Sequence, residues 1–305
     1  MLVTLAAFAR LSRPLFLGGG VLGGALGTAV AAFEGHPFAW GLYALAQTAI
    51  SAFQLMTHYA NDFFDRDGDR GGSRTLFSGG SGVLSESALR PRLALRAALA
   101  ALAIGLLATF ALAAGGRPLA AAFALATALG AWIYSAPPLR LVARGLGELD
   151  AVVVVGLLVP LCAYAAQAGV PTPLALAASA PGAAAMFGLM LAVELPDRAA
   201  DEAAGKRTLI VRWDSPAVCA LAIAGALGAS AAGVALAVAC GAPRTLAWAG
   251  VAGLGPGIAL VVAVSRRAYL RPRGAALVAA AGVALFALVA LAATLAFALR
   301  AAAVA

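Results

Sequence analysis

The chain has 305 residues, of which 63% are hydrophobic and only 11% are charged, and its mean hydropathy is +0.96. A soluble domain carries about 25% charged residues, so this chain has too few charges to cover a water-facing surface, which excludes a soluble globular protein. The formal net charge of +8 does not indicate nucleic-acid binding, because the basic residues lie in short loops between apolar stretches rather than on one polar domain.

The first predicted element is a short helix over residues 1–13 that lies along the membrane surface. Leu2, Leu5 and Phe8 supply apolar side chains, and Arg10 and Arg13 supply charge at its end. This pattern is typical of an interfacial amphipathic helix rather than of a spanning one.

Apolar stretches bounded by charged residues predict nine membrane-spanning helices. A helix needs roughly 20 apolar residues to cross about 30 Å of hydrocarbon. One stretch is about twice that length, and Pro171-Thr172-Pro173 divides it into two crossings. The stretches are 14–33, 35–61, 97–116, 118–139, 151–193, 215–243, 245–265 and 274–299. The sequence therefore predicts an all-α, polytopic membrane protein.

An acidic cluster, Asn61-Asp62-Phe63-Phe64-Asp65-Arg66-Asp67-Gly68-Asp69, follows the second predicted span. If the helix continues through it, Asn61, Asp65 and Asp69 lie four residues apart on one face. Carboxylates so placed repel one another unless a cation neutralises them, and oxygen ligands suit Mg²⁺. A solvated acidic helix end is the plain alternative. A calcium-binding loop is excluded, because Arg70 stands where that loop requires glycine.

A second acidic cluster, Glu194-Leu195-Pro196-Asp197-Arg198-Ala199-Ala200-Asp201-Glu202, follows the sixth predicted span and again sets two aspartates four residues apart. It leads into Gly205-Lys206-Arg207, which contains the only lysine in the chain. Glycine beside two cations lets backbone and charge approach a phosphate, although Lys-Arg near a membrane is equally a topology signal. Together, two carboxylate clusters with adjacent cations predict a site for Mg²⁺ and pyrophosphate.

The charges also predict an orientation. With the N-terminus inside, nine crossings place 18 of the 21 basic residues on the inner side and leave Arg117, Arg244 and Arg300 outside. This agreement predicts a cytoplasmic N-terminus in a bacterial-type cytoplasmic membrane. The same count places 12 of the 13 acidic residues inside, with only Glu34 outside. Because acidic residues do not follow the topology rule, their one-sidedness predicts a site that opens to the cytoplasm.

The spans divide into an internal near-repeat within a single domain, 1–305. Two four-helix units, 14–139 and 151–265, each carry an acidic cluster after their second helix, and a ninth helix follows at 274–300. This architecture predicts two acidic sites that face each other across a central cavity.

Several motifs resemble the UbiA superfamily of membrane prenyltransferases. Asn61-Asp62-x-x-Asp65-x-x-x-Asp69 and Asp197-x-x-x-Asp201 look like its two aspartate-rich motifs. The runs Tyr134-Ser135-Ala136-Pro137-Pro138-Leu139-Arg140 and Gly145-Leu146-Gly147-Glu148 resemble its loop after span 4. Gly205-Lys206-Arg207-Thr208-Leu209 and Phe77-Ser78-Gly79-Gly80-Ser81-Gly82-Val83-Leu84 resemble the branch containing MenA, the 1,4-dihydroxy-2-naphthoate prenyltransferases.

The resemblance implies an enzyme that transfers a polyprenyl group from a polyprenyl diphosphate to a small aromatic acceptor, using two Mg²⁺ ions. Its partners are then these two substrates and membrane lipid. The implied metal ligands are Asn61, Asp62, Asp65, Asp69, Asp197 and Asp201. Asp65, Asp69, Asp197 and Asp201 are also the implied catalytic residues, together with Tyr134, and Lys206, Arg207 and Arg140 are implied to bind the diphosphate.

The resemblance favours 1,4-dihydroxy-2-naphthoate as acceptor, on the route to menaquinone, and leaves 4-hydroxybenzoate as an alternative. A secondary transporter is the rival from another class, because it also fits nine spans and a repeat. A transporter requires charged or broken helices at the bilayer midplane, whereas the acidic residues here lie at the predicted helix ends. The enzyme is therefore the favoured interpretation.

Overall fold

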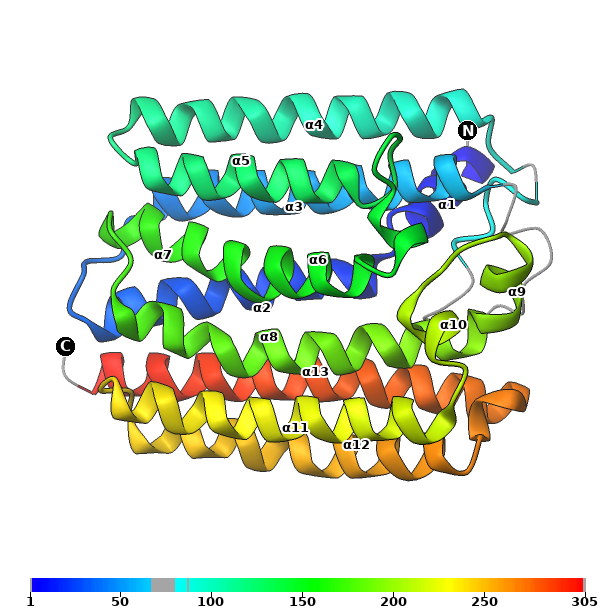
Figure 1. Ribbon diagram of the computed structural model, residues 1–305. Helices are drawn as coiled ribbons and strands as arrows, with labels where there is room; N and C mark the ends of the chain where they lie inside the picture. The colour runs from blue at the N-terminus through cyan, green and yellow to red at the C-terminus, as the bar shows by residue number, and fades with distance from the viewer. Residues whose placement is uncertain (1, 67–79, 87, 304–305) are drawn as a thin grey trace.

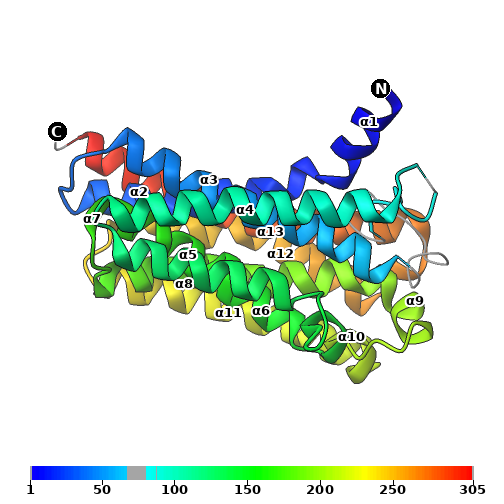
Figure 2. The same cartoon turned by 90° about the horizontal axis from the view of Figure 1, so that it is seen from above.

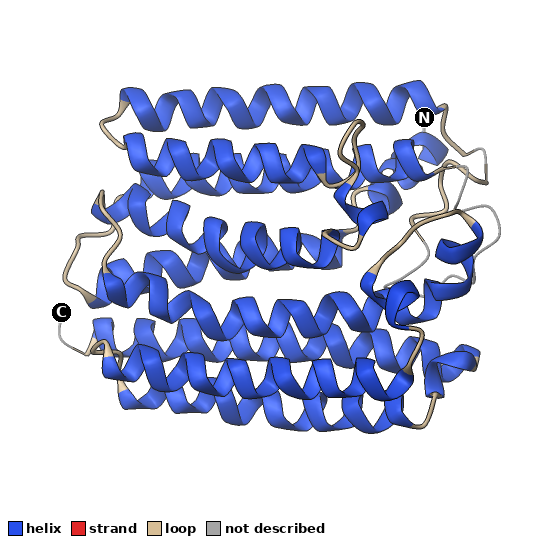
Figure 3. Cartoon of the chain, in the orientation of Figure 1, coloured by secondary structure: helices blue, strands red, loops and turns tan. Residues whose placement is uncertain are grey.

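Helices form the regular structure of the computed structural model, which describes residues 2–66, 80–86 and 88–303. Within these ranges no strand occurs (Figure 3). The long helices lie side by side and run the length of the molecule (Figure 1). The predicted all-α class is confirmed.

The principal helices follow one another with short connections. They are α1 (Leu2–Leu11), α2 (Pro14–Phe33), α3 (Trp40–Asp65), α4 (Pro91–Ala114), α5 (Pro118–Ile133), α6 (Gly147–Val153), α7 (Val159–Ala168), α8 (Pro173–Glu194), α9 (Arg198–Ala203), α10 (Leu209–Trp213), α11 (Pro216–Ala239), α12 (Ala247–Ser265) and α13 (Pro272–Ala302). A π-helical turn, Val154–Leu158, joins α6 to α7, so these two form one continuous segment.

Proline marks the start of many of these helices. It occupies the first position of α2, α4, α5, α8, α11 and α13. The first turn of a helix has no partner for its N–H groups, so the missing N–H of proline costs nothing there, and its fixed φ already suits the helix. The charges delimit the spans only approximately, whereas the prolines locate where the helices begin.

Seven helical segments in the described part of the chain are long and apolar enough to cross a membrane. They are Pro14–Phe33, Pro91–Ala114, Gly147–Ala168, Pro173–Ala203, Pro216–Ala239, Arg244–Ser265 and Pro272–Ala302. The chain is therefore an integral membrane protein. Two of the predicted spans correspond to helices outside this set: α5 is apolar but has 16 residues, and α3 has 26 residues but carries several polar side chains. The nine crossings accordingly stay a prediction.

Two helix starts differ from the predicted spans. The helix predicted from residue 35 begins at Trp40, because Gly35 has a left-handed backbone (φ 86°) and Pro37 interrupts the segment that follows. The helix predicted from residue 97 begins at Pro91 and includes the exposed Arg92. Arginine side chains extend to water while their backbone stays helical, so a charge did not end this helix.

Two boundaries around the next connection also differ. The span predicted to residue 139 ends at Ile133, before Pro137 and Pro138, which cannot donate helical hydrogen bonds. The span predicted from residue 151 begins at Gly147, with Glu148 and Asp150 in its first turn. Acidic side chains are favourable at a helix N-terminus, so these charges belong to the helix rather than to the loop before it.

Glycines bring α2 into close contact with α7. A methyl group added at Gly27 would lie 2.0 Å from the carbonyl oxygen of Pro160, and one added at Gly23 would lie 2.8 Å from a methyl carbon of Val159. Small residues permit this approach, which favours helix association in lipid. On its other side α2 packs against α13, which also contacts α8. The last helix thus contacts helices from both predicted units.

One end of the bundle gathers the segments that carry the motifs. Figure 1 shows the ends of α3, α5 and α8 together with α1, α9 and α10 at this end, which we call the site end. Helix α1 projects away from the bundle there (Figure 2). It is held through Ala7 and Leu11, which pack against Val83, Leu84, Leu89 and Ala94.

Glu34 lies at the opposite end of the bundle, after α2. Its carboxylate accepts hydrogen bonds from the Tyr164 hydroxyl at 2.6 Å and from the Thr172 hydroxyl at 3.0 Å. These bonds tie the α2–α3 connection to the α7–α8 connection. The acidic residue that the sequence separates from the others therefore has a structural role away from the site end.

Candidate functional site

A cavity of about 340 Å³ lies within the bundle and reaches the site end. Its deep part is lined by apolar side chains, including those of Phe16, Ile50, Phe53, Val155, Met186, Leu189 and Phe286. Toward the site end its lining is polar and charged, with Arg13, Asn61, Asp65, Tyr134, Glu194, Asp197, Asp201, Lys206 and Thr208. A ligand with a charged head and an apolar tail matches this division.

The two acidic clusters meet at Lys206. Asp65 is the last residue of α3, and Asp201 lies in α9. The Lys206 Nζ is 3.0 Å from Asp65 Oδ2 and 3.1 Å from Asp201 Oδ1. Burial by itself lowers the pKa of Lys206, but the two carboxylates outweigh burial, and the pKa is raised. Lys206 is therefore a fixed positive charge between carboxylates that stand far apart in the sequence.

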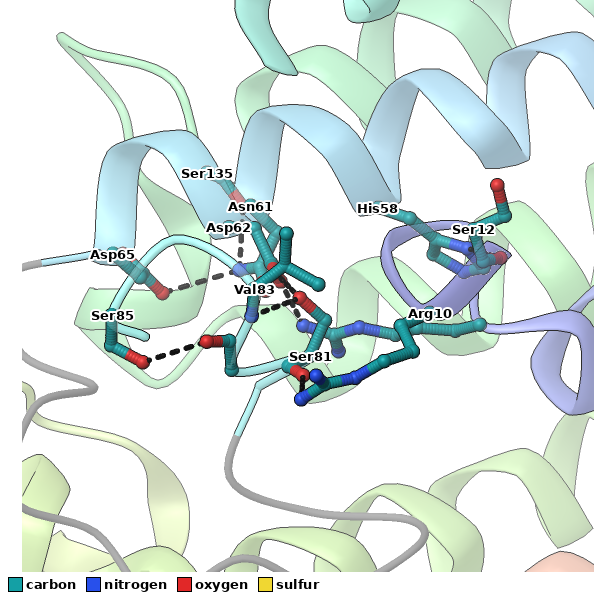
Figure 4. A network of polar contacts seen from close by, with 12 residues as sticks. Arg10, Ser12, His58, Asn61, Asp62, Asp65, Ser81, Val83, Ser85 and Ser135 are labelled. Carbon is teal, nitrogen blue, oxygen red and sulfur yellow. Dashed lines mark hydrogen bonds and ion pairs between the residues drawn. The ribbon is translucent and has the colours of Figure 1, made fainter. Parts of the chain in front are cut away.

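Asp65 is buried, at 4% exposure, and has further polar partners. The Asn61 amide donates hydrogen bonds to Asp65 Oδ2 at 3.2 Å and to the Ser135 hydroxyl at 3.0 Å (Figure 4). The Arg140 guanidinium donates to Asp65 Oδ1 at 3.1 Å. Because α3 continues through Asp65, the expected shared face of Asn61 and Asp65 is observed. Asp69 lies outside the described residues.

The second cluster lies on a bend rather than on one helix. Helix α8 ends at Glu194, a 3₁₀ turn covers Leu195–Asp197, and α9 begins at Arg198. Asp197 and Asp201 both line the cavity. Arg198 instead forms ion pairs with Glu202, at 3.5 Å, and with Asp214. The bend thus separates the carboxylates of this cluster between the cavity and the exterior.

Two loops that the resemblance singled out are bonded to each other. The N–H of Arg207 donates to the carbonyl of Ala143 at 2.9 Å, and the Arg212 guanidinium donates to the carbonyl of Arg144 at 2.5 Å. Gly145, with φ 67°, is required there, because a methyl group would lie 2.6 Å from the Arg207 carbonyl oxygen. The 141–148 segment thereby fixes the backbone beside Lys206.

Not every predicted phosphate ligand reaches the cavity. The side chain of Arg207 is exposed and is not part of the cavity lining, whereas Lys206 is. Tyr134 follows α5 and lines the cavity beside Gly147, where a methyl group would lie 3.2 Å from its ring. Arg140 is not part of the lining either, but it pairs with Asp65 at 3.1 Å, so it lies next to the carboxylates, whereas Arg207 does not.

Asp62, which the sequence groups with the metal ligands, has other partners. One of its oxygens pairs with the Arg13 guanidinium and the other accepts a hydrogen bond from the Ser81 hydroxyl. Nearby, His58 Nδ1 is 2.9 Å from the Ser12 carbonyl oxygen (Figure 4). Arg10 pairs with Glu86 at 2.9 Å. These contacts tie the α1–α2 junction and the 80–86 segment to α3.

We expect Asp62→Asn to loosen this junction without weakening metal binding. Losing a buried, charge-assisted interaction costs about 2 kcal/mol, so amide hydrogen exchange should become faster in residues 6–14 and 80–86. The Mg²⁺ concentration that gives half-maximal activity should stay at the wild-type value. A large increase in that concentration, without faster exchange, would instead identify Asp62 as a ligand.

The structure adds residues to the site to which the sequence motifs assign no role. Arg13 lines the cavity from a left-handed backbone position, φ 44°, just before Pro14. Glu148 and Glu194 are buried next to the two clusters. The sequence patterns that could have pointed to these residues are Arg13 directly before the helix-starting Pro14, and the glutamates Glu148 and Glu194 within motifs. None of these patterns indicates burial, which depends on how the helices pack.

The sequence and the fold were compared with known proteins. The UbiA prenyltransferase family matches residues 20–276. Comparison with curated proteins finds no sequence match.

Solved structures share the fold at low identity. A UbiA homologue from Archaeoglobus fulgidus, solved with GPP and Mg²⁺, is 17% identical and has a TM-score of 0.64, covering 92% of this chain and 99% of its own. A digeranylgeranylglyceryl phosphate synthase is 15% identical, with a TM-score of 0.61 and coverage of 97% and 99%. A UbiA homologue from Aeropyrum pernix K1 is 19% identical, with a TM-score of 0.52 and coverage of 90% and 96%. The family match spans most of the chain, so this protein belongs to the UbiA prenyltransferase family and is a transferase.

Proposed function

We propose that this protein transfers a polyprenyl group from a polyprenyl diphosphate to an aromatic acceptor in a Mg²⁺-dependent reaction. The observation that carries the proposal is the meeting of Asp65 and Asp201 at Lys206, at the polar end of a cavity whose deep part is apolar. A polyprenyl diphosphate has the same division into a charged head and an apolar tail. The Archaeoglobus fulgidus homologue has been solved with GPP and with DMAPP, each with Mg²⁺, which supports the choice of substrate class and metal.

The donor groups at the site fit Mg²⁺. In the described ranges no group of three or more His, Cys, Asp or Glu side chains is arranged to hold a metal by itself. Mg²⁺ does not need such a cage, because it binds through one or two carboxylates and completes its shell with waters and substrate phosphates. Asp65 with Asn61, and Asp201 with Asp197, supply oxygen ligands of that kind on two sides of the cavity.

We assign one Mg²⁺ ion to Asn61, Asp65 and Asp69, and a second to Asp197 and Asp201. When bound there, the ions neutralise the charge that the diphosphate gains as the allylic C–O bond breaks. Asp62 is left to its structural contacts with Arg13 and Ser81.

The chain's own residues orient the diphosphate and protect the allylic carbon. Lys206 and Arg140 contact Asp65 and donate to phosphate oxygens when the head group arrives. Tyr134 contributes to positioning from the end of α5. The apolar deep part of the cavity holds the isoprenoid tail and excludes water, which would otherwise capture the allylic cation.

The acceptor we propose is 1,4-dihydroxy-2-naphthoate, which would place the enzyme in menaquinone biosynthesis, with 4-hydroxybenzoate as the alternative. The support is the likeness of residues 77–84 and 205–209 to the MenA branch. We also propose nine crossings, a cytoplasmic N-terminus and a site open to the cytoplasm, on the strength of the uneven distribution of basic residues.

The direct test is to incubate membranes containing the protein with Mg²⁺, radiolabelled geranyl diphosphate and a panel of aromatic acids. Label should move into 1,4-dihydroxy-2-naphthoate and should stop moving when EDTA removes Mg²⁺. Transfer into 4-hydroxybenzoate alone would correct the acceptor and keep the reaction class. Transfer into no acid on the panel would contradict the proposed reaction.

A further inference from the structure

The site contains a pair of buried acidic side chains that the proposed chemistry leaves without a role. Glu194 is the last residue of α8 and lines the cavity, and Glu148 lies in the first turn of α6. Glu194 is 9% exposed and Glu148 is fully buried. Glu148 is near Glu194 but is not part of the cavity lining.

Three of the four oxygens in this pair have no hydrogen-bond donor in the described structure. Glu148 Oε1 accepts the N–H of Leu209 at 2.6 Å, whereas Glu148 Oε2 and both oxygens of Glu194 accept nothing. Buried polar atoms almost always have a partner, because leaving one without a partner is costly. A proton shared by the two carboxyl groups would engage one oxygen of each, and the other oxygen of Glu194 would still lack a hydrogen-bond donor. Because Glu194 lines the cavity, a hydroxyl group on a bound ligand can supply this donor.

The depth of Glu194 indicates which part of which ligand that is. It is the last residue of α8, and Asp197 follows in the 3₁₀ turn at the site end, so Glu194 lies deeper in the bundle than Asp197. The cavity residues further inward on α8 are all apolar, namely Val193, Met190, Leu189 and Met186. Glu194 thus lies where the charged head of a prenyl diphosphate ends and its tail begins. The allylic carbon lies at that junction, and the acceptor has to reach it there.

We propose that Glu194 is the acceptor subsite, where its carboxyl group accepts a hydrogen bond from a hydroxyl group on the aromatic ring. This proposal rests on the proposed function and deepens it, because it selects acceptors that carry a hydroxyl near the alkylated carbon. The hydroxyl is the only hydrogen-bond donor on an ionised hydroxy-aromatic acid, so it is the group that can bond to an oxygen of Glu194. The ring therefore binds with its hydroxyl toward Glu194.

The test separates acceptor binding from diphosphate binding. Calorimetry would measure the affinity of Mg²⁺-loaded protein for geranyl thiodiphosphate, an unreactive analogue, and then the affinity of that complex for 1,4-dihydroxy-2-naphthoate and 4-hydroxybenzoate. Glu194→Leu removes both side-chain oxygens that can accept a hydrogen bond, and Glu194→Gln keeps one such oxygen in an uncharged amide. We expect acceptor affinity to fall about tenfold to a hundredfold in Glu194→Leu, with Glu194→Gln in between, and the affinity for the thiodiphosphate to stay unchanged.

Glu202→Gln is the matched control, because Glu202 lies at the same end but is 58% exposed. It should bind both ligands like the wild type, and O-methylated acceptors should not distinguish wild type from Glu194→Leu. Unchanged acceptor affinity in Glu194→Leu, or an equal loss of thiodiphosphate affinity, would overturn the inference. So would wild-type protein that binds the thiodiphosphate but neither hydroxy acid. Wild-type protein that does not bind the thiodiphosphate with Mg²⁺ would overturn the proposed function itself.

Discussion

Asp65→Ala and Asp201→Ala are each expected to reduce the rate of prenyl transfer by about a thousandfold or more. A factor of this size corresponds to about 4 kcal/mol of lost transition-state stabilisation, which is in the range found when a group that stabilises developing charge is removed. Each change removes a proposed Mg²⁺ ligand and one partner of Lys206. The measurement is the initial rate of label transfer from geranyl diphosphate at saturating Mg²⁺, in membranes with matched protein content.

Asp214→Ala is the control for these variants. Asp214 lies near the same end and pairs with Arg198, but it is 71% exposed and is not part of the cavity. It should keep nearly wild-type activity. Comparable amounts of membrane-inserted protein in all three variants would exclude a folding defect. Near-normal turnover in Asp65→Ala or Asp201→Ala would refute the metal assignment.

Lys206→Met is expected to have the second largest effect, about a hundredfold loss of kcat/KM for the prenyl diphosphate. The change removes the cation that lies between Asp65 and Asp201, and with it a donor to the phosphate oxygens. It also leaves two carboxylates facing each other with less neutralising charge. In EDTA the thermal stability of the variant should therefore be lower than that of the wild type. Adding Mg²⁺ should raise the stability of the variant more than it raises that of the wild type.

Lys206→Arg is the companion variant, since it retains the charge with a different shape. It should recover the stability in EDTA and only part of the activity, because a planar guanidinium does not replace a compact ammonium group between two carboxylates. If Mg²⁺ stabilises Lys206→Met no more than it stabilises the wild type, then the ion does not bind between these carboxylates.

Local patterns in the sequence were sufficient for the fold class and for the ends of many helices. Apolar stretches of spanning length predicted an all-helical membrane protein, and a proline occupies the first position of six long helices. The predicted boundaries were wrong where a charge was taken to end a span. Arg92 lies inside α4, and Glu148 lies inside the first turn of α6. A charged residue indicates that water or another polar group is close to its side chain, but it does not by itself end a helix.

The motif spacing also predicted one feature of the site correctly. Asn61 and Asp65 are four residues apart, and the helix that contains them places their side chains in hydrogen-bond contact. Asp62 is adjacent in the same motif, yet it points to Arg13 and Ser81. Neighbouring residues on a helix face different directions, so membership in a motif does not establish a shared role.

The sequence by itself determined the chemistry available to this protein: a lipid-embedded helical scaffold, two acidic clusters and a single lysine. Only the tertiary structure decided which of these groups meet. Asp65, Asp201 and Lys206 converge because α3, α9 and the segment after α9 lie at one end of the bundle, although the residues are up to 141 positions apart. The burial of Glu194 at the edge of the apolar cavity was decided in the same way. Contacts between distant segments depend on how helices pack, and packing is a property of the whole chain that no local pattern of residues contains.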